Sequence, residues 1–579
     1  MDKQALIEKI QTLGGLTNDE KSALLELLRS HKKYGLVWED KPEDVEERLR
    51  DELPVLTEVK ERALISDVPD APNHILIEGD NLEALTALSY THEGKVDVIY
   101  IDPPYNTGKE FIYKDNFYES SRNSLVTLDD PYRHSKWLSF MYKRLIIAKR
   151  LLSDAGVIFI SIDDNEMANL KLLCDEVFFE KNFLGEFIHQ RAKGGGQAKH
   201  IVKGHDYILC YAHDATIAQI SRPKVIQQGI VVHNGIECLR NDDVIRKTFG
   251  KYDKTLGDRR CFYEELIEYK GLAKKNEVDK LVQKGIYCLE KNKTGMHTIV
   301  EYIPVSSARS KHYSIIKVLS EIGKQELEDL GISNFDYPKP LELIRLLTGS
   351  IYRDDTTILD FFAGSGTTLH ATMQLNAEDG GHRKCILVTN NENGICENIT
   401  YERNKRVIQG YTTPKGEKVP GLTANTLRYY KTDFISRDRT QRNMHALVEA
   451  ATDLLCIKED LYEEQTHFGQ YKTHPKVLRY FAKGNKRMLV LYRDEYTEEV
   501  AAEMQRIHLP QGEKIKVYIF SPDRYAYDDM FQDVAEKVTL VALPAAIYDA
   551  YKKVLPKRRE KLLELQTDHN ETNEEGGEQ

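Results

Sequence analysis

The chain has 579 residues, of which 41% are hydrophobic and 30% charged, a composition typical of a folded protein with about three or four domains. No apolar stretch approaches the ~20 residues of a membrane span, and the N-terminus lacks a secretory pattern, so we expect a cytoplasmic protein without a membrane partner. The eight cysteines form no Cys-x-x-Cys pair that could begin a zinc site. The formal net charge of −11 argues against a uniformly basic DNA-binding surface but not against a local one.

The N-terminal segment, residues 1–50, is predicted to be helical. Its apolar residues recur at helical spacing from Ala5 to Leu13. Thr17 and Glu20 then form a capping-box pattern before a second apolar run. We expect a small helical lead-in to the rest of the chain.

An apolar run from Val96 to Ile101 predicts a buried strand that ends at the turn Asp102-Pro103-Pro104-Tyr105. In such a turn, a carboxylate can accept a hydrogen bond from an exocyclic amine, and two prolines fix the backbone carbonyls. A tyrosine ring can stack on a planar base. The turn therefore predicts a site for a flipped-out nucleobase, the alternative being an ordinary Pro-Pro turn.

Basic and aromatic residues are interleaved in two segments in the middle of the chain, residues 190–203 and 240–275. This mixture suits a groove for nucleic acid, whereas the alternative is a solvated charged surface. The residues concerned are Arg191, Lys193, Lys199, Lys203, Arg246, Lys247, Lys251, Lys254, Arg259 and Arg260, with Phe249, Tyr252, Phe262 and Tyr263 among them.

A second polar turn follows the strand predicted at residues 357–360. The run from Asp360 to Thr367 combines a strand end, the glycines Gly364 and Gly366, and a helix start, and the glycines let a ligand approach the backbone. The run lacks the lysine of a triphosphate loop, and it also lacks the third glycine of the dinucleotide fingerprint. A smaller adenosyl ligand fits the pattern better.

Together, the two turns resemble those of amino-methyltransferases that use S-adenosyl-L-methionine, in which a Phe-x-Gly-x-Gly turn holds the cofactor and an Asp-Pro-Pro-Tyr turn holds the target amine. Because the catalytic turn comes first, the chain resembles the permuted beta group of DNA adenine-N6 methyltransferases. The likeness is greatest to the modification subunits of Type III restriction-modification systems. It implies an α/β, Rossmann-like methyltransferase fold with permuted motif order, an inserted target-recognition domain and a small C-terminal α/β domain.

The resemblance implies scaffold roles for segments around the catalytic turn, residues 102–105. Residues 132–149 look like the next helix of the family, ended by Gly156, and residues 157–164 look like the strand after it. The run His205–Ala212 looks like the last strand on the catalytic side, where it helps to wall the base pocket. A buried edge strand would have the same pattern.

The resemblance also implies the residues that hold the cofactor. Asp80 would lie near the adenine, although its position equally suits a helix N-cap, and Lys339 would contact the methionine carboxylate. Many relatives place a glutamate on the ribose hydroxyls, and here Thr389, Asn391 and Glu392 remain alternatives for that role. No metal is expected. The residues expected at the cofactor are Asp80, Phe335, Lys339, Asp360, Phe362, Ala363, Gly364, Ser365, Gly366, Thr367, Asn391 and Glu392.

Alternating strand and helix signals in the two catalytic segments predict a parallel sheet, and the segment between them is too long for a loop. A later region has three predicted strands, at residues 487–492, 514–520 and 538–543, and no catalytic pattern. The regions are a helical segment at 1–50, a catalytic domain at 51–212 and 335–411, a target-recognition domain at 213–334, a C-terminal α/β domain at 412–566 and a disordered acidic tail at 567–579.

We therefore predict transfer of a methyl group from S-adenosyl-L-methionine to the N6 amine of adenine in a short sequence of double-stranded DNA. The family suggests a homodimer and a separate restriction subunit, an ATP-dependent nuclease and translocase. One alternative is cytosine-N4 methylation, although its catalytic turn more often begins with serine. Methylation of RNA or of a protein glutamine, and a role mainly in DNA recognition for the nuclease, are further alternatives.

Overall fold

The computed structural model describes residues 36, 38–40, 43–107, 132–193, 200–224, 229–248 and 259–557. The predicted helices before residue 36, the glycine run at 194–196 and the predicted tail at 567–579 lie outside the described residues, as do Lys199, Phe249, Lys251, Tyr252 and Lys254. The chain divides into two compact units. The second comprises Ile220–Tyr313 and Gly349–Tyr352, and the first contains the rest.

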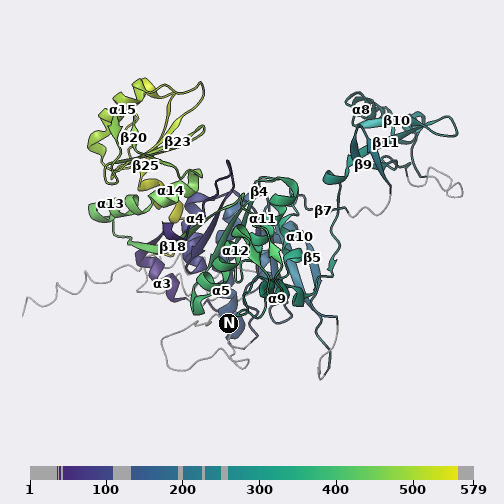
Figure 1. The fold of residues 1–579 in the computed structure, drawn as a ribbon, viewed down its shortest axis with the longest axis horizontal. Coiled ribbons are helices and arrows are strands. Elements are labelled where there is room, and N and C mark those ends of the chain that lie inside the picture. Colours follow the sequence, from purple (N-terminus) through teal and green to yellow (C-terminus); the bar gives the residue numbers. More distant parts are fainter. Residues whose placement is uncertain are drawn as a thin grey trace, which may run out of the picture. The chain divides into compact units, whose positions relative to one another are not determined.

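A ten-stranded sheet forms the centre of the first unit (Figure 1), in the order β1-β18-β2-β15-β14-β3-β4-β6-β5-β13. The strands from β18 to β4 run parallel, as the alternating pattern predicted, whereas β1 and β6 pair antiparallel with their neighbours. The strands are β1 (Glu52–Glu58), β2 (Asn73–Glu78), β3 (Val96–Ile101), β4 (Leu152–Ile162), β5 (Phe183–Gln190), β6 (His205–Ala212), β13 (Ile315–Ile316), β14 (Thr357–Asp360), β15 (Lys384–Thr389) and β18 (Thr426–Ser436).

Two pairings in this sheet decide where the predicted turns lie. Strand β3 pairs with β14, with Val98 opposite Ile358, so the segments that precede the two turns are neighbours despite their distance in the sequence. Because both strands are parallel, their carboxyl ends, and therefore both turns, lie at the same edge of the sheet. Strand β6 pairs with both β4 and β5, so it is not an edge strand.

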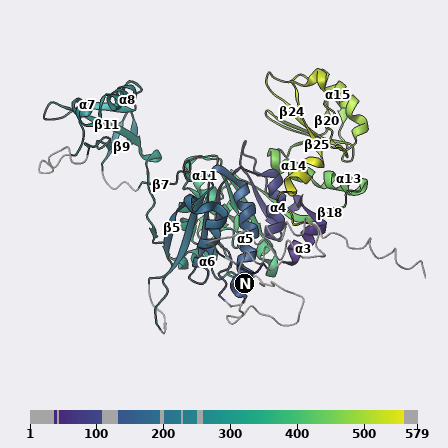
Figure 2. The ribbon, with the colours of Figure 1, turned by 180° about the vertical axis from the view of Figure 1, so that it is seen from behind.

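Helices cover both faces of the sheet, as Figures 1 and 2 show from opposite sides. The prediction that Gly156 ends the helix before β4 is wrong, because that helix already ends at Leu151 and Gly156 lies inside the strand. One face is covered by α10 (Leu341–Thr348), α11 (Thr367–Asp379) and α12 (Glu402–Gln409), and the other by α4 (Asn81–Thr91), α5 (Arg133–Leu151) and α6 (Met167–Cys174).

The C-terminal region is part of the first unit and adds a five-stranded sheet. The three strands predicted there are present as β23, β24 and β25. Leu447, Tyr518 and Tyr551 belong to the same hydrophobic cluster as Leu49 and Leu85, so this region shares part of its core with the large sheet. It also has a hydrophobic cluster of its own, which includes Leu489 and Val517. Its elements include α13 (Gln441–Ala450), α14 (Thr452–Glu459), β19 (Glu464–Gln465), β22 (Leu478–Lys483), β23 (Lys486–Leu491), α15 (Thr497–Arg506), β24 (Ile515–Phe520), β25 (Val538–Leu543) and α16 (Ala545–Tyr551).

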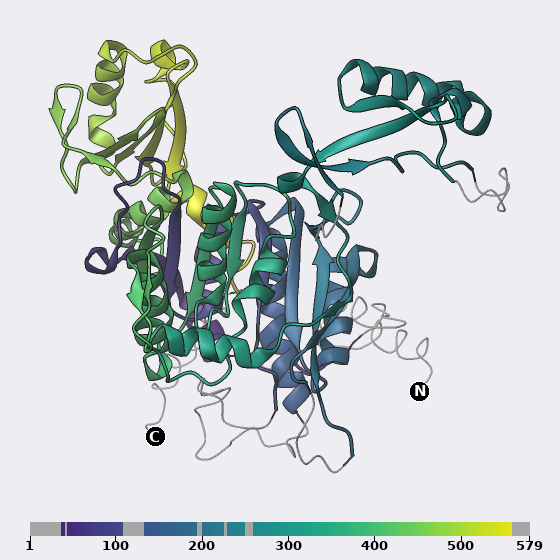
Figure 3. The same cartoon turned by 45° about the vertical axis from the view of Figure 1, so that its right-hand side comes forward.

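The second unit has its own small core, which includes Leu266, Val278 and Ile299. The predicted insertion, 213–334, extends beyond this unit, because α9 (Ser320–Asp329) belongs to the first unit, as does α3 (Asp44–Asp51) near the start of the chain. None of the described helices is both long and apolar enough to cross a membrane. Figure 3 shows the helices of the second unit, in teal, over its four-stranded sheet. Its elements include β8 (Ile230–His233), β9 (Ile236–Asn241), α7 (Leu266–Lys270), α8 (Leu272–Gln283), β10 (Tyr287–Lys291) and β11 (His297–Pro304).

Candidate functional site

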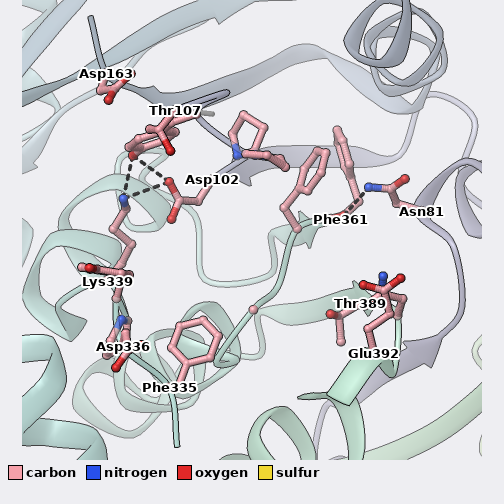
Figure 4. A pocket seen from close by; sticks show the side chains of 18 of the residues that line it. Asn81, Asp102, Thr107, Asp163, Phe335, Asp336, Lys339, Phe361, Thr389 and Glu392 are labelled. Carbon is pink, nitrogen blue, oxygen red and sulfur yellow. Dashed lines mark hydrogen bonds and ion pairs between the residues drawn. The ribbon is translucent and has the colours of Figure 1, made fainter. Parts of the chain in front are cut away.

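A cavity of about 1020 Å³ lies at the carboxyl ends of the parallel strands of the large sheet (Figure 4). Its walls come from the segments that follow β2, β3, β14 and β15, with further residues from α3, α5, α9 and the segment before α10. This is the edge at which open α/β sheets bind ligands, because helix N-termini and loops converge there. The cavity therefore contains the catalytic turn and part of the predicted cofactor turn.

The catalytic turn, residues 102–105, is fixed by a buried tryptophan. The indole N–H of Trp137, on α5, donates to the carbonyl oxygen of Pro104 at 2.7 Å. Trp137 is only 2% exposed, so this bond is protected from water. The Pro104 carbonyl is thus already engaged, and Asp102 and Pro103 line the cavity beside it.

The carboxylate of Asp102 is held by two side chains through one of its oxygens (Figure 4). The Tyr105 hydroxyl donates to Oδ1 of Asp102 at 2.8 Å, and the ammonium group of Lys339 lies 2.9 Å from the same oxygen. Lys339 also donates to the Tyr105 hydroxyl at 2.7 Å. Lys339, expected at the cofactor carboxylate, thus contacts the catalytic turn, and these contacts do not use Oδ2 of Asp102.

Beyond the turn, Asn106 has a positive φ of 53°, a conformation that costs a non-glycine residue free energy and requires support. That support comes from Glu166, whose buried carboxylate accepts from the Asn106 amide at 2.5 Å and from the Asn169 amide at 2.8 Å. The His134 ring nitrogen Nδ1 lies 2.6 Å from the same carboxylate. The catalytic turn is therefore anchored on both sides.

The glycine turn after β14 bends sharply over buried groups. Gly364 and Gly366 have φ values of 50° and 74°, and a Cβ atom on Gly366 would lie 2.5 Å from Nδ2 of Asn404. Asp360 accepts hydrogen bonds from the Phe362 N–H at 3.0 Å and from the Thr368 hydroxyl at 2.5 Å. Burial raises the pKa of the Asp360 carboxyl to about 7. Through these two bonds, the Asp360 carboxyl stabilises the turn without lining the cavity.

A buried arginine supports the same turn. The guanidinium of Arg403, on α12, donates to the hydroxyls of Ser365 at 3.1 Å and Thr367 at 2.6 Å. Both residues are buried, and neither lines the cavity. Ser365 and Thr367, predicted at the cofactor, thus bond to Arg403 in this structure.

Residues near the start of the first unit and on α5 line the part of the cavity next to Asp80. Asp80 is the N-cap of α4, accepting from the Leu82 N–H at 2.7 Å, and it also lines the cavity. The fully buried guanidinium of Arg144 lies 3.5 Å from Asp80 and donates to both carboxylate oxygens of Glu43, at 2.9 and 3.0 Å. The Phe140 ring lies 3.6 Å from that guanidinium and also lines the cavity.

The end of β15 and the segment after it line the part of the cavity in which the ribose of the cofactor is expected. Thr389, Asn390 and Glu392 line the cavity, whereas Asn391 turns away and accepts from the Glu397 N–H at 3.1 Å. Among the described residues, Oδ1 of Asn390 has no hydrogen-bond partner although it is buried. An unpaired buried acceptor at a cavity wall is what a hydroxyl-bearing ligand would satisfy.

Carboxylates dominate the cavity wall. Burial raises the pKa of the Asp206 carboxyl, on β6, and Arg191 lies 3.3 Å from it. An excess of negative charge favours a ligand with cationic groups. The acidic lining residues are Glu43, Asp44, Asp80, Asp102, Asp163, Asp206, Glu321, Asp336 and Glu392, and the basic ones are Arg191, Lys324 and Lys339.

Of the predicted site residues, six lie behind the cavity wall. Sequence reasoning missed Asn81, Asp163 and Asn390, each of which lies just after a strand, so the strand-end rule that identified residue 102 could have found them. The predicted residues that line the cavity are Asp80, Asp102, Pro103, Pro104, Tyr105, Phe335, Lys339, Phe362, Gly364 and Glu392, and those that do not are Asp360, Ala363, Ser365, Gly366, Thr367 and Asn391.

Several cations of the predicted basic groove form ion pairs with nearby carboxylates in the structure. In the second unit, Arg246 pairs with Asp243 at 2.5 Å and Lys247 with Glu265 at 2.7 Å. In the first unit, Lys203 pairs with Asp164 at 2.8 Å. Local carboxylates thus offset several of the cations on which the sequence pattern rested.

The sequence of the chain is similar to those of several known proteins. A family profile described as DNA methylase matches residues 96–412. The chain is 33% identical to the Type III restriction-modification enzyme StyLTI Mod subunit of Salmonella typhimurium, over 57% of this chain and 56% of that protein. It is 31% identical to the Type II methyltransferase M.KpnI of Klebsiella pneumoniae, over 63% and 89%. It is 32% identical to the Type III EcoPI Mod subunit of Escherichia phage P1, over 64% and 66%.

Proposed function

The chain belongs to the DNA methylase family, and we propose that it transfers a methyl group from S-adenosyl-L-methionine to the N6 amine of adenine in double-stranded DNA. One observation carries the proposal. Asp102 and Pro103 line the same cavity as Gly364 of the glycine turn, while Trp137 engages the Pro104 carbonyl. We assign the Asp102 carboxylate and the Pro103 carbonyl as the two acceptors for a primary amine, which has two N–H groups to donate.

The cavity fits the proposed cofactor in three respects. Its volume of about 1020 Å³ is at the upper end for small-molecule sites, with room for the cofactor and an inserted base. Its excess of carboxylates suits a ligand with a sulfonium and an ammonium group, and Oδ1 of Asn390 is free to accept from a hydroxyl. When bound, the cofactor supplies a methyl group on a positively charged sulfur. Residues Asp80, Phe335, Phe362, Gly364 and Glu392 would hold it.

The chain's contribution to the reaction is to orient the amine and to offset charge. The lone pair of the adenine amine is delocalised into the ring, so the amine is a weak nucleophile. Hydrogen bonds to Asp102 and Pro103 would turn the nitrogen toward the methyl group and stabilise the positive charge that develops on it. The base must leave the duplex, at a cost of a few kcal/mol, and stacking on Tyr105 would offset part of that cost.

At the level of the whole protein, we propose the modification and recognition subunit of a Type III system. Two similar proteins, the StyLTI and EcoPI Mod subunits, are Type III subunits, and the aligned part spans 56% of the first of them. The unit Ile220–Tyr313, inserted between the catalytic segments, would read the target sequence. Pairing as a homodimer, association with a restriction subunit, and a cytoplasmic location beside the DNA belong to the same proposal.

The test is to incubate DNA with the purified protein and S-adenosyl-L-methionine and to sequence it by a method that reports modified bases. We expect N6-methyladenine at one short motif with the wild type and none with Asp102→Ala. Equilibrium dialysis with labelled cofactor should give the same affinity for both. Modified cytosine instead would favour the cytosine-N4 alternative, and an equal rate with Asp102→Ala would refute the assigned site. Co-purification with a nuclease would separate a Type III subunit from a solitary methyltransferase.

A further inference from the structure

Lys339 is held in place next to the catalytic turn. It lies between α9 and α10, and its carbonyl accepts from the Thr367 hydroxyl at 3.3 Å. The preceding residue packs so closely on α9 that a Cβ atom on Gly323 would lie 2.3 Å from the Pro338 carbonyl oxygen. The lysine side chain is 14% exposed. The position of its ammonium group is therefore set by the fold.

The ammonium group faces an acidic neighbourhood. Oδ1 of Asp102 lies 2.9 Å from it, and burial raises the pKa values of the carboxyls of Asp206 and Asp360, both of which interact with Asp102. Like charges at close range disfavour ionisation, and a cation at hydrogen-bond distance favours it. The titratable and charged groups around Asp102 are Lys339, Tyr105, Tyr100, His189, Arg191, Asp163, Asp206 and Asp360.

We propose that Lys339 is a positioning residue for Asp102: its contact with Oδ1, together with that of the Tyr105 hydroxyl, orients the carboxylate so that Oδ2 is left for the amine. This rests on the proposed function, because it assigns Asp102 the role of amine acceptor. It differs from the role that the family resemblance implies, in which the lysine binds the carboxylate of the cofactor. The two roles predict opposite results for cofactor affinity.

The experiment compares Lys339→Met, which removes the charge, with Lys339→Arg, which keeps it. Lys516→Met is the matched control, because Lys516 also lies 2.9 Å from a carboxylate, that of Glu459, but in the C-terminal sheet. Cofactor affinity is measured by equilibrium dialysis without DNA. The rate of methyl transfer is then measured in single turnovers at saturating cofactor.

For Lys339→Met, we expect cofactor affinity within about twofold of the wild type and a rate of methyl transfer lower by about 10- to 100-fold, because the Asp102 carboxylate loses one of the two groups that orient it. Lys339→Arg should restore most of this rate, and Lys516→Met should leave both readouts unchanged. A merely structural role would lower cofactor affinity together with the rate.

Three outcomes separate this inference from the proposed function. A tenfold or larger loss of cofactor affinity in Lys339→Met, with Lys339→Arg also weak, would overturn the inference in favour of a cofactor contact. An unchanged rate of methyl transfer together with unchanged affinity would overturn it as well. If the wild type methylates no adenine, the proposed function fails, and the binding comparison, which needs no DNA, still decides between the two roles of Lys339.

Discussion

Replacing Trp137 with phenylalanine removes the N–H group that donates to the Pro104 carbonyl at 2.7 Å. The carbonyl is then left without its donor in a site where the ring is 2% exposed, and an unpaired buried acceptor costs about 1–3 kcal/mol. The loss of packed ring atoms adds to this cost. Because the same bond fixes the catalytic turn, small displacements of Asp102 and Pro103 should slow methyl transfer by about 10- to 100-fold.

The assay combines urea unfolding, cofactor binding and single-turnover methylation. For Trp137→Phe, we expect a lower free energy of unfolding, cofactor affinity within about twofold, and the slower transfer. Trp38→Phe is the matched control, because the Trp38 indole donates to the Ser139 hydroxyl at 3.1 Å, away from the catalytic turn. This control should lose some stability and keep its rate. Equal slowing by both variants, or a normal rate in Trp137→Phe, would refute the anchoring role.

Three further predictions concern stability. Burial raises the pKa of the Glu83 carboxyl from 4.5 to about 7, so the folded state keeps a proton that the unfolded state releases. The free energy of unfolding should therefore fall as the pH rises between these values. Urea unfolding at pH 5 and pH 8 should show this fall in the wild type and a smaller one in Glu83→Gln. Gly366→Ala should lower the free energy of unfolding by about 1–3 kcal/mol, because its Cβ would meet Asn404 at 2.5 Å and its φ is 74°. Arg144→Met should cost about 3–5 kcal/mol and weaken cofactor binding, measured by dialysis, because it leaves Glu43 and Asp80 without their shared cation.

The sequence predicted strands well where apolar runs ended in turns. The strand Val538–Leu543 has the predicted bounds, and the run up to Ile101 ends one residue before the catalytic turn, as expected. Gly156 misled the prediction because a glycine after a helical pattern is a common C-cap. Here the backbone carbonyl of Val96 and that of Ser153 approach the residue within 3 Å of where a Cβ would lie, so the glycine serves close packing inside β4.

For the site, the motifs located the cavity but did not show which side chains face it. Asp360 and Thr367 belong to the glycine turn, yet their side chains bond to Thr368 and Arg403 behind it. A sequence motif includes residues that stabilise the turn through internal hydrogen bonds as well as residues that contact a ligand. Chain position alone therefore cannot separate the two roles, whereas burial and hydrogen-bond partners do.

The surroundings of Asp80 in the cavity show a stronger limit of prediction from the sequence. Arg144 lies in α5 three residues after Met141 and one before Leu145, both fully buried, so the apolar spacing alone gives no reason to bury an arginine there. It is fully buried because acceptors from distant segments, Glu43 and the Asp80 carboxylate, converge on its guanidinium. Burying a charge is favourable only when partners satisfy it, and those partners are known only once the chain has folded. The same convergence brings the start of α3 to the cavity wall, so the region before the first strand forms part of the candidate site as well as packing on the sheet.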